Sequence, residues 1–386
     1  MPSTDAYWIA LRSVHGVGPK VAHALIEKFG APDQIFGRSK DALASAGIPR
    51  KTAQAVASFN NFDNAEKAVC EMQSIGARLV GITDADYPVY LRHIADPPPF
   101  LYVRGNANLG NSHCIAIVGA RAASDAGLRM AERLGLELAA RGFAVVSGLA
   151  RGIDCAAHQG ALDAGGCTIA VMGSGIDMIY PPEHRELAAK MIANGGAVVS
   201  ELPIGTPPAA ENFPTRNRIL SGMCLGVVIV EAAERSGSLI TARMALEQDR
   251  QIFAVPGSPL SGKSSGSNRL IKNGAKLVEC VEDVIEELLP QMTPDQRSGV
   301  QAQLATSPKL AEISKNSASS TASALDESLD DGAKVVLSCL KSADRLHIDS
   351  ILASCHLSSP AVLGILLDLE LRGRVAQHPG KFFSLA

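Results

Sequence analysis

Hydrophobic positions in the middle of the chain follow two alternating patterns. Short apolar runs such as Ile115–Gly119 and Phe143–Ser147 each end in a glycine-containing turn, and a stretch with helical apolar spacing follows each turn. Further apolar runs occur at Thr168–Met172, Leu225–Val230 and Gln251–Val255. Short β-branched runs are typical of buried strands, whereas apolar residues spaced three and four apart are typical of helices. Alternation of the two over about 170 residues predicts an α/β fold with an open, doubly wound and mostly parallel sheet.

The first 64 residues read as short helices instead. Two helical stretches flank His15–Lys20, which contains Gly-Val-Gly, and a weaker copy of this arrangement surrounds Gly47. Helix, glycine hairpin, helix is the form of a helix-hairpin-helix (SAM-like) domain, whose hairpin amides and nearby lysine suit a nucleic-acid backbone. The same pattern fits a small helical bundle that binds nothing, and the sequence leaves both interpretations open.

Residues 65–290 form the predicted α/β domain together with its N-terminal connector. The prolines at 97–99 indicate an extended connector in which Phe100–Val103 is an edge strand, because proline cannot donate to a central strand. Residues 291–332 are rich in Ser, Ala, Thr and Asp without a periodic apolar face, which predicts a flexible linker. Residues 333–386 contain three helical segments and a hairpin pattern, the arrangement of a winged-helix domain. Its third helical segment is apolar or acidic, so protein contact and DNA contact both remain open.

Composition narrows the class of protein. A chain of 386 residues with 46% hydrophobic content is long enough for two or three globular domains. A formal net charge of -3 gives no basic field over the whole molecule, so a polyanion must meet a local patch. The eight cysteines are dispersed without a CxxC pair, which predicts buried thiols in a reducing compartment. Neither a signal-peptide pattern nor a membrane-spanning run occurs, so we expect a cytoplasmic protein that does not contact a membrane.

Glycine, serine and arginine gather in the turns that follow the predicted strands. Because ligands of an open α/β sheet bind at the carboxyl ends of its strands, these turns should share one edge. Backbone amides at helix starts bind phosphate, and arginine adds bidentate charge. A single turn of this kind is often only a tight turn, but the repetition predicts a row of phosphate sites. The predicted phosphate-binding residues are Gly119, Arg121, Ser147, Gly148, Arg151, Gly152, Arg216, Asn217, Arg218, Ser236, Gly237, Ser238, Gly266 and Asn268.

The same turns carry no recognisable motif for catalysis, a cofactor or a metal. The first two match neither GxGxxG nor a Walker loop. Asp154 and His158 lie four residues apart on one predicted helix, but no nucleophile accompanies them, so we interpret Asp154 as a helix cap and His158 as a satisfied buried histidine.

Asp177, Glu201 and Glu231 lie at predicted strand ends, where an acidic residue can bind a ribose or a metal or hold a neighbouring arginine, as Glu231 could hold Arg235. No spacing among the three specifies a metal site. We expect Thr215 to cap the helix that it opens. The sequence therefore predicts no catalytic residue, no metal ligand and no cofactor.

The order of the motifs resembles the DprA/Smf family of bacterial DNA-processing proteins. The stretches that carry the resemblance are IVGAR, SGLARGIDCAAHQGAL, GGCTIAVMGSGIDMIYPPEH, SELPIGTPP, FPTRNRILSG, VIVEAAERSGSLITARMA, FAVPG and SGSNRLIKNGA. The resemblance extends over nearly the whole chain and includes the helical start, an extended Rossmann-like domain and the winged-helix end. Two departures are visible, because Ala120 and Cys224 stand where the family usually has serine.

The resemblance implies a protein without enzymatic activity. It implies binding of single-stranded DNA, protection of that DNA and loading of the RecA recombinase onto it in natural transformation, by a homodimer formed through the Rossmann-like domain. Carried over by motif, Arg121 is the first choice for a phosphate contact, followed by the turn Ser147–Gly152 and by Arg216–Arg218. The aromatic content of 4% argues against extensive base stacking. We therefore expect mostly electrostatic, sequence-tolerant and salt-sensitive binding.

Two functions of other classes remain as alternatives. The first is a nucleotide-binding or phosphoribohydrolase-like enzyme on a related Rossmann scaffold, a group that carries Pro-Gly-Gly-x-Gly-Thr-x-x-Glu. Here Pro256-Gly257 is followed by Ser-Pro-Leu-Ser, without that glutamate. The second is a winged-helix transcription regulator with a ligand-sensing domain, which the apolar third helical segment disfavours.

Overall fold

The computed structural model describes residues 2–110, 113–292, 331–340, 345–355, 358–371, 375–378 and 380–385. The described residues up to Met292 belong to one compact unit, and those from Asp331 onward belong to a second. The predicted linker, 291–332, lies outside the described residues except for its first two and last two positions.

Short helices build the N-terminal part of the first unit, as the sequence predicts. Two helix–hairpin–helix pairs are present, α1 with α2 and α3 with α4, and their hairpin glycines, Gly16 and Gly47, both have positive φ. The helix α5 crosses the predicted domain boundary at residue 64 and packs on α1. The helices are α1 (Thr4–Ser13), α2 (Pro19–Phe29), α3 (Lys40–Ala44), α4 (Arg50–Ala57) and α5 (Phe62–Ser74), with a 3₁₀ turn at Pro32–Gln34.

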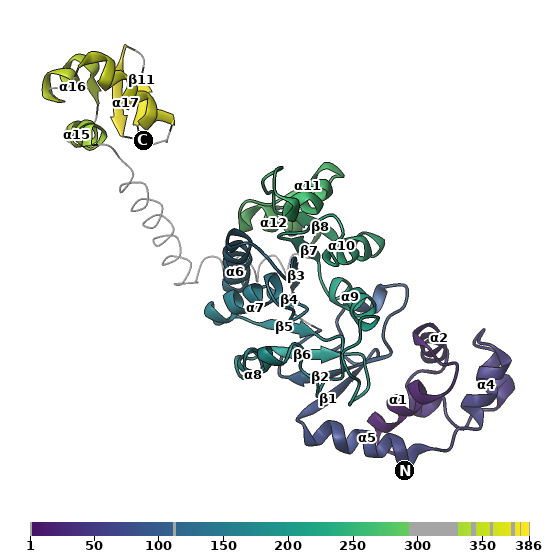
Figure 1. The fold of residues 1–386 in the computed structure, drawn as a ribbon. Coiled ribbons are helices and arrows are strands. Elements are labelled where there is room, and N and C mark those ends of the chain that lie inside the picture. Colours follow the sequence, from purple (N-terminus) through teal and green to yellow (C-terminus); the bar gives the residue numbers. More distant parts are fainter. Residues whose placement is uncertain are drawn as a thin grey trace. The chain divides into compact units, whose positions relative to one another are not determined.

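The rest of the first unit is built around a nine-stranded sheet (Figure 1). The strand order in the sheet is β1-β2-β6-β5-β4-β3-β7-β8-β9. The strands from β6 to β9 in this order are parallel, and β2 is antiparallel to both of its neighbours. The mostly parallel, doubly wound fold is therefore confirmed. The strands are β1 (Ala77–Gly81), β2 (Phe100–Gly105), β3 (Cys114–Val118), β4 (Ala144–Ser147), β5 (Thr168–Val171), β6 (Ala197–Ser200), β7 (Gly226–Ile229), β8 (Gln251–Ala254) and β9 (Lys276–Leu277).

The prediction that Phe100–Val103 is an edge strand is wrong. This segment is β2, which lies between β1 and β6, and β1 forms the edge. The prolines 97–99 precede the strand, so none of them removes a donor from the ladder; the carbonyl of Pro99 even accepts a hydrogen bond from the Ile82 amide at 2.9 Å.

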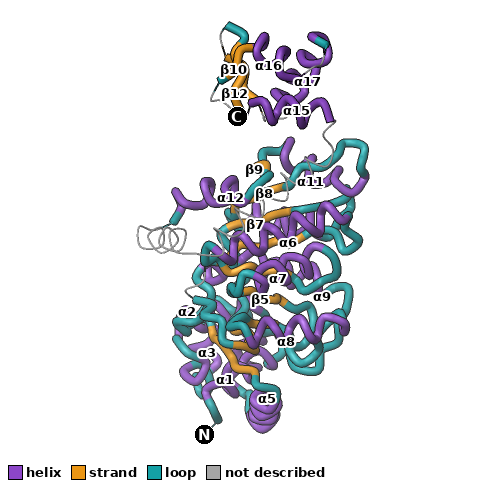
Figure 2. Tube along the Cα trace, turned by 90° about the vertical axis from the view of Figure 1, so that its left-hand side faces the viewer, coloured by secondary structure: helices purple, strands orange, loops and turns teal. Residues whose placement is uncertain are grey.

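Helices cover both faces of the sheet (Figure 2). Successive strand residues point to opposite faces, so Ile115 and Ile117 pack in a core with α6, α7 and α12, whereas Ala116 and Val118 pack in a core with α9 and α10. The helices are α6 (Asp125–Ala140), α7 (Ile153–Asp163), α8 (Arg185–Ala193), α9 (Asn212–Gly222), α10 (Ser238–Glu247), α11 (Ser265–Lys272) and α12 (Val281–Leu288), with 3₁₀ turns at Tyr90–His93, Pro182–His184, Gly262–Ser264 and Leu289–Gln291.

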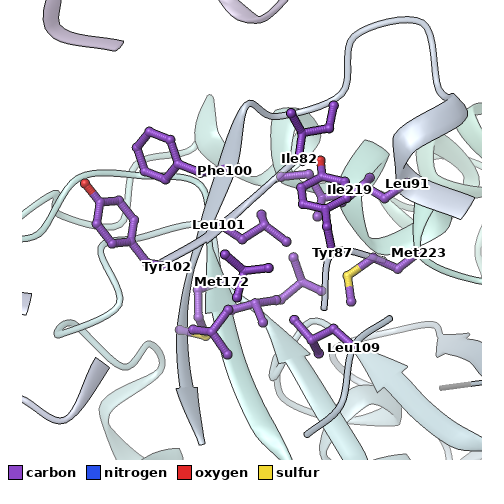
Figure 3. Close-up of a cluster of buried hydrophobic side chains, with 14 of the residues drawn as sticks. Ile82, Tyr87, Leu91, Phe100, Leu101, Tyr102, Leu109, Met172, Ile219 and Met223 are labelled. Atoms are coloured by element: carbon purple, nitrogen blue, oxygen red, sulfur yellow. The ribbon is translucent and has the colours of Figure 1, made fainter. Parts of the chain in front are cut away.

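The N-terminal helices and the sheet share one hydrophobic core. Trp8 of α1 packs edge-on against Phe100 of β2, with ring centroids 6.3 Å apart. A side chain at Gly81 would collide with the Trp8 ring, so glycine is required there. The connector before β2 packs on α9, and Tyr87 and Leu91 lie beside Ile219 and Met223 (Figure 3). The helical region is therefore joined to the sheet domain through packed side chains.

The second unit is a winged-helix domain, as predicted. Val336, Ile351 and Leu366, one from each helix, lie in its buried core. On the third helix, α17, Leu363 and Leu367 are 51% and 58% exposed. The elements are α15 (Asp331–Leu340), α16 (Ile348–Cys355), α17 (Ser359–Leu371) and a sheet in the order β10-β12-β11, with β10 (Leu346–His347), β11 (Val375–His378) and β12 (Phe382–Leu385).

None of the helices in the described ranges has both the length and the apolar character that a membrane crossing requires.

Candidate phosphate-binding cavity

A cavity of about 380 Å³ opens at the carboxyl ends of β3 and β7. These strands are neighbours in the sheet, but the chain runs from β3 to β4 on one side and reaches β7 on the other. Such a switch point is where open α/β sheets bind their ligands. The predicted residues that line the cavity are Gly119, Arg121, Arg216, Asn217, Ser236, Gly237 and Ser238. Gly148 and Arg151 line a smaller adjoining cavity that shares Arg121 and Phe213 with the first.

Arg121 is the exposed cation at the junction of the two cavities. Its guanidinium lies over the ring of Phe213, 5.3 Å from the ring centroid, and Tyr180 packs against the same ring at 5.9 Å. Within the described part of the chain, no carboxylate forms an ion pair with Arg121. Its positive charge is therefore available to an anionic ligand, and two aromatic rings lie beside it.

Sequence reasoning missed Phe213 and Tyr180 as members of the site. The low aromatic content predicts little base stacking, but two of the chain's rings line the cavities. The position of Phe213 in FPTRNR, directly before the predicted arginines, was the signal that pointed to it.

Two helix N-termini point toward the cavities. The helices α10 and α7 begin after Gly237 and Gly152, and neither cap residue makes a side-chain hydrogen bond. The helix dipole favours an anion at such N-termini. In α10, however, the amides of Ser238, Leu239 and Ile240 already donate within the preceding turn, to the Ser236 hydroxyl at 3.4 Å and to the carbonyls of Ser236 and Gly237, both at 3.1 Å. Gly152 has φ 75°, and a side chain on it would collide with the carbonyls of Ala120 and Arg121. The absence of a side chain at Gly152 therefore allows the turn after β4 to contact the turn after β3.

Arg216 and Asp154 are buried and shape the turn between β4 and α7. Arg216 donates to the carbonyls of Gly148, at 3.0 Å, and Val171. Asp154 accepts from the amides of Gly148, at 3.0 Å, and Ala150, at 3.3 Å. Burial lowers the pKa of Arg216 to about 10, although the Asp154 carboxylate opposes this effect. Arg216 is therefore charged at neutral pH. Its guanidinium donates to the carbonyls of Gly148 and Val171 and to the side chain of Asn217.

Ser147 is also structural, because its hydroxyl is fully buried and donates to the carbonyl of Ile117 at 2.6 Å. Arg151 is exposed and forms an ion pair with Glu183 at 2.5 Å, so a phosphate must compete with that carboxylate.

Five predicted residues do not line either cavity: Ser147 and Gly152, described above, and three others. Arg218 is buried and pairs with Glu201 at 2.6 Å and with Asp96 at 3.3 Å. The amide of Gly266 donates to the carbonyl of Ala232 at 2.8 Å. The side chain of Asn268 bridges the amide and the carbonyl of Gly257, at 3.1 and 2.8 Å. All three residues hold turns of the same sheet edge in place.

The turn that Asn268 closes contains another pattern that sequence reasoning missed. Residues 257–264 read G-x-x-x-x-G-K-S between a strand and a helix, the form of a phosphate-binding P-loop. Its amides, however, are used inside the turn: Leu260 donates to the Ser258 hydroxyl and Lys263 to the Ser261 hydroxyl, both at 3.3 Å. The turn therefore lacks the open amide cradle that binds nucleotide phosphates in P-loops.

The predicted roles of the acidic residues need correction. Asp154 is not a helix cap, since its carboxylate binds amides of the preceding turn. Glu231 does not hold Arg235. Its carboxylate accepts from the amide and the hydroxyl of Ser124, at 2.9 and 3.1 Å, in the segment that follows β3 and leads into α6. Thr215 does not cap α9, which begins three residues earlier, and its hydroxyl donates to the carbonyl of Glu211.

His158 is only half satisfied. Its Nδ1 lies 2.6 Å from the hydroxyl of Thr168, and its Nε2 is buried without a partner among the described residues. Burial lowers the pKa of His158 to about 3, and the charges of His184 and Arg216 add to this effect. In the part of the chain that the structure describes, this neutral histidine hydrogen-bonds only to the buried Thr168 hydroxyl, which is held by the Val145 carbonyl, and neither residue lines a cavity. No group of three or more potential metal ligands occurs in the described ranges.

The fold and the cavity define a class: a Rossmann-like protein with a cavity at the switch point of its sheet, preceded in the sequence by a helix-hairpin-helix region and followed by a winged-helix domain. Family models identify the class more closely. Residues 78–289 match the model for DNA recombination-mediator protein A, residues 320–381 the DprA winged helix domain, and residues 9–59 the SAM-like helix-hairpin-helix tandem. The chain belongs to the DprA/Smf family.

Relatives of the chain agree with this assignment. Protein Smf of Synechocystis sp. is 33% identical over 393 residues, which cover 98% of each chain. The X-ray structure of DNA processing protein A from Streptococcus pneumoniae has a TM-score of 0.64 and 36% identity, and covers 75% of this chain and 99% of its own. DNA processing protein A from Helicobacter pylori, solved in a study of its single-stranded DNA binding mode, has a TM-score of 0.50 and 28% identity, and covers 56% and 97%.

Proposed function

We propose that this protein binds single-stranded DNA, with one nucleotide of the strand entering the cavity at the carboxyl ends of β3 and β7. The observation that carries the proposal is the Arg121 guanidinium, which lies over Phe213 without a carboxylate partner among the described residues and borders both cavities. A phosphate suits the guanidinium and the positive end of the α10 dipole, and a base suits the rings of Phe213 and Tyr180. Rings recognise any base by its face, so we expect no marked sequence preference.

A binding role is favoured over an enzymatic one by the lining of the cavity. Its one carboxylate belongs to Asp154, which is held by two amides and by the neighbouring Arg216 charge. A glutamate free to act on a nucleotide, as the phosphoribohydrolase alternative needs, is not part of this lining. We therefore propose that the protein has no enzymatic activity and needs no cofactor.

We further propose that the protein helps to load the RecA recombinase onto the bound strand in natural transformation, and that it works in the cytoplasm as a homodimer through its Rossmann-like domain. Membership of a recombination-mediator family supports the first proposal. The homodimer is supported by the last strand, β9, which has one neighbour in the sheet and leaves Leu277 38% exposed. Such an edge can pair with a second copy of the chain. Light scattering of the purified chain tests the dimer, and RecA filament assembly on protein-coated oligonucleotide tests the loading.

The test of the site is a fluorescence-anisotropy titration of labelled oligo-dT and of duplex DNA of equal length. Arg121→Ala should weaken binding of the single strand strongly. A matched control exists in Arg38, an exposed arginine that lies over the ring of Phe29 at 4.7 Å in the helical region, away from the cavity. Arg38→Ala removes the same charge and the same type of ring contact. Equal losses in both variants, or no preference for the single strand, would contradict the proposed site.

A further inference from the structure

Four charged side chains form a network of alternating charges that links the N-terminal helices to α9 and to the connector before β2. Arg12 of α1 lies 3.1 Å from one oxygen of Glu201, and Arg218 of α9 lies 2.6 Å from the other. Arg218 also pairs with Asp96 in the connector at 3.3 Å and donates to its carbonyl at 2.9 Å. Glu201 and Arg218 are both buried. Two positive and two negative charges balance, so this charge network carries no net charge to offer a phosphate.

The helix that receives this network also carries much of the cavity wall. Phe213, Arg216 and Asn217 of α9 line the cavity. Arg216 and Arg218 are two residues apart, which places them about 200° apart around the helix axis. Arg216 reaches the turn after β4, whereas Arg218 reaches Glu201 after β6. The helix is therefore held from two sides, with Asn217 between the two anchors.

We propose that Arg218 is a positioning residue, and that Arg12, through Glu201 and Arg218, makes the N-terminal helical region a support of the cavity. The inference rests on the proposed function, because it concerns the same site. It gives the helical region a role that needs no contact between its hairpins and DNA. It also replaces the prediction that Arg218 contacts phosphate: a phosphate ligand would have to displace two carboxylates from a buried guanidinium.

The salt dependence of binding separates positioning from contact. The slope of log Kd against log salt concentration reports the number of phosphates neutralised, at about 0.7 per phosphate for a single strand. Loss of a contacting arginine lowers both the affinity and the slope. Loss of a positioning arginine lowers the affinity and leaves the slope unchanged. A change that only lowers global stability leaves both unchanged as long as the protein is folded.

The experiment uses the full chain and labelled oligo-dT at three salt concentrations. The test variant is Arg12→Met, because Arg12 is the more accessible end of the network and Glu201 keeps Arg218 as a partner. Arg12→Lys tests rescue by a conservative change, and Arg121→Gln serves as the contact reference. The matched control is Arg78→Met, which removes an arginine paired with Asp86 at 3.3 Å on the far edge of the sheet. Hydrogen exchange of the α9 amides is measured in all variants.

We expect Arg12→Met to weaken binding by about 3- to 30-fold with the wild-type slope, and to speed amide exchange in α9. Arg12→Lys should recover most of the affinity, and Arg78→Met should behave as wild type. A folded Arg12→Met variant with the affinity and α9 exchange of Arg78→Met overturns the inference. A slope reduced as in Arg121→Gln also overturns it, because the network would then contact phosphate.

Two further outcomes remain decisive. If Arg12→Met does not fold, Asp96→Asn takes its place, since Asp96 is a half-exposed partner of Arg218; unchanged affinity and unchanged α9 exchange in that variant overturn the inference. If wild type does not bind oligo-dT, the proposed function fails, and α9 exchange in Arg12→Met against Arg78→Met still decides whether the network positions the helix.

Discussion

The buried histidine of α7 makes the stability of the first unit depend on pH. The Thr168 hydroxyl donates its single proton to the carbonyl of Val145 at 2.8 Å, so it must accept from Nδ1–H of His158. The ring is then neutral, with a bare and buried Nε2. Burial lowers its pKa from 6.5 to about 3. Between these values the unfolded chain binds a proton that the folded chain does not.

The sign and the size of the effect follow from this difference. The pKa is depressed in the folded state, so the stability is fully present above pH 6.5 and falls as pH decreases toward 3. Each pH unit inside that window costs about 1.4 kcal/mol. Between pH 7.5 and pH 5.5 His158 should lower the free energy of unfolding by about 1.4 kcal/mol. Only the step from pH 6.5 to pH 5.5 contributes, because above pH 6.5 the histidine is neutral in both the folded and the unfolded chain.

Urea unfolding at pH 5.5, 6.5 and 7.5 measures the effect. The only tryptophan, Trp8, is buried in the first unit and reports its unfolding by fluorescence. His158→Gln should be less stable at pH 7.5 but should lose about 1.4 kcal/mol less than wild type on going to pH 5.5. His15→Gln, at an exposed position, should keep the wild-type pH dependence. Equal pH dependence in wild type and His158→Gln would refute the reasoning.

Three further predictions concern the cavity and are measured by the same oligo-dT titration. Glu183→Gln should release Arg151 for phosphate, with tighter binding and a salt slope larger by about 0.7; unchanged binding would show that Arg151 does not contact the strand. Gly148→Ala places a methyl group 2.5 Å from the Arg216 guanidinium and should destabilise the turn by about 1–3 kcal/mol and weaken binding; wild-type melting and binding would contradict this. Phe213→Leu should cost about 1–3 kcal/mol of binding at an unchanged salt slope, and a reduced slope would assign its effect to Arg121 instead.

The fold was predictable because its signals are local. Apolar runs and glycine turns specify the parallel strands, and the order of the elements specifies the doubly wound sheet. The place of β2 was not predictable in this way. Its proline-rich approach suggested an edge, whereas its actual neighbours are set by packing of the connector on α9, in which Tyr87 and Leu91 contact residues more than a hundred positions away in sequence.

The sheet edge that carries the candidate cavity was also predictable, but the partners of its arginines were not. Arg121 and Arg218 both follow strands of one edge and both belong to motifs of the family. Arg121 is exposed and lies over the ring of Phe213, whereas Arg218 is buried between carboxylates that are 17 and 122 residues away in sequence. Whether an arginine is available to a ligand depends on partners that only the folded chain brings together.

This distinction changes the expected character of binding. The sequence predicts mostly electrostatic binding, but Arg216 is balanced by Asp154 and Arg151 is paired with Glu183. With Arg121 alone the slope of log Kd against log salt concentration should be about 0.7 per chain, and with Arg151 released about 1.4. Affinity must then come mainly from a base that fills the cavity beside the aromatic rings and from the helix dipoles that favour its phosphate. A much steeper slope would require a basic surface outside the cavity, and the two exposed hairpins of the helical region would be the next part of the first unit to test.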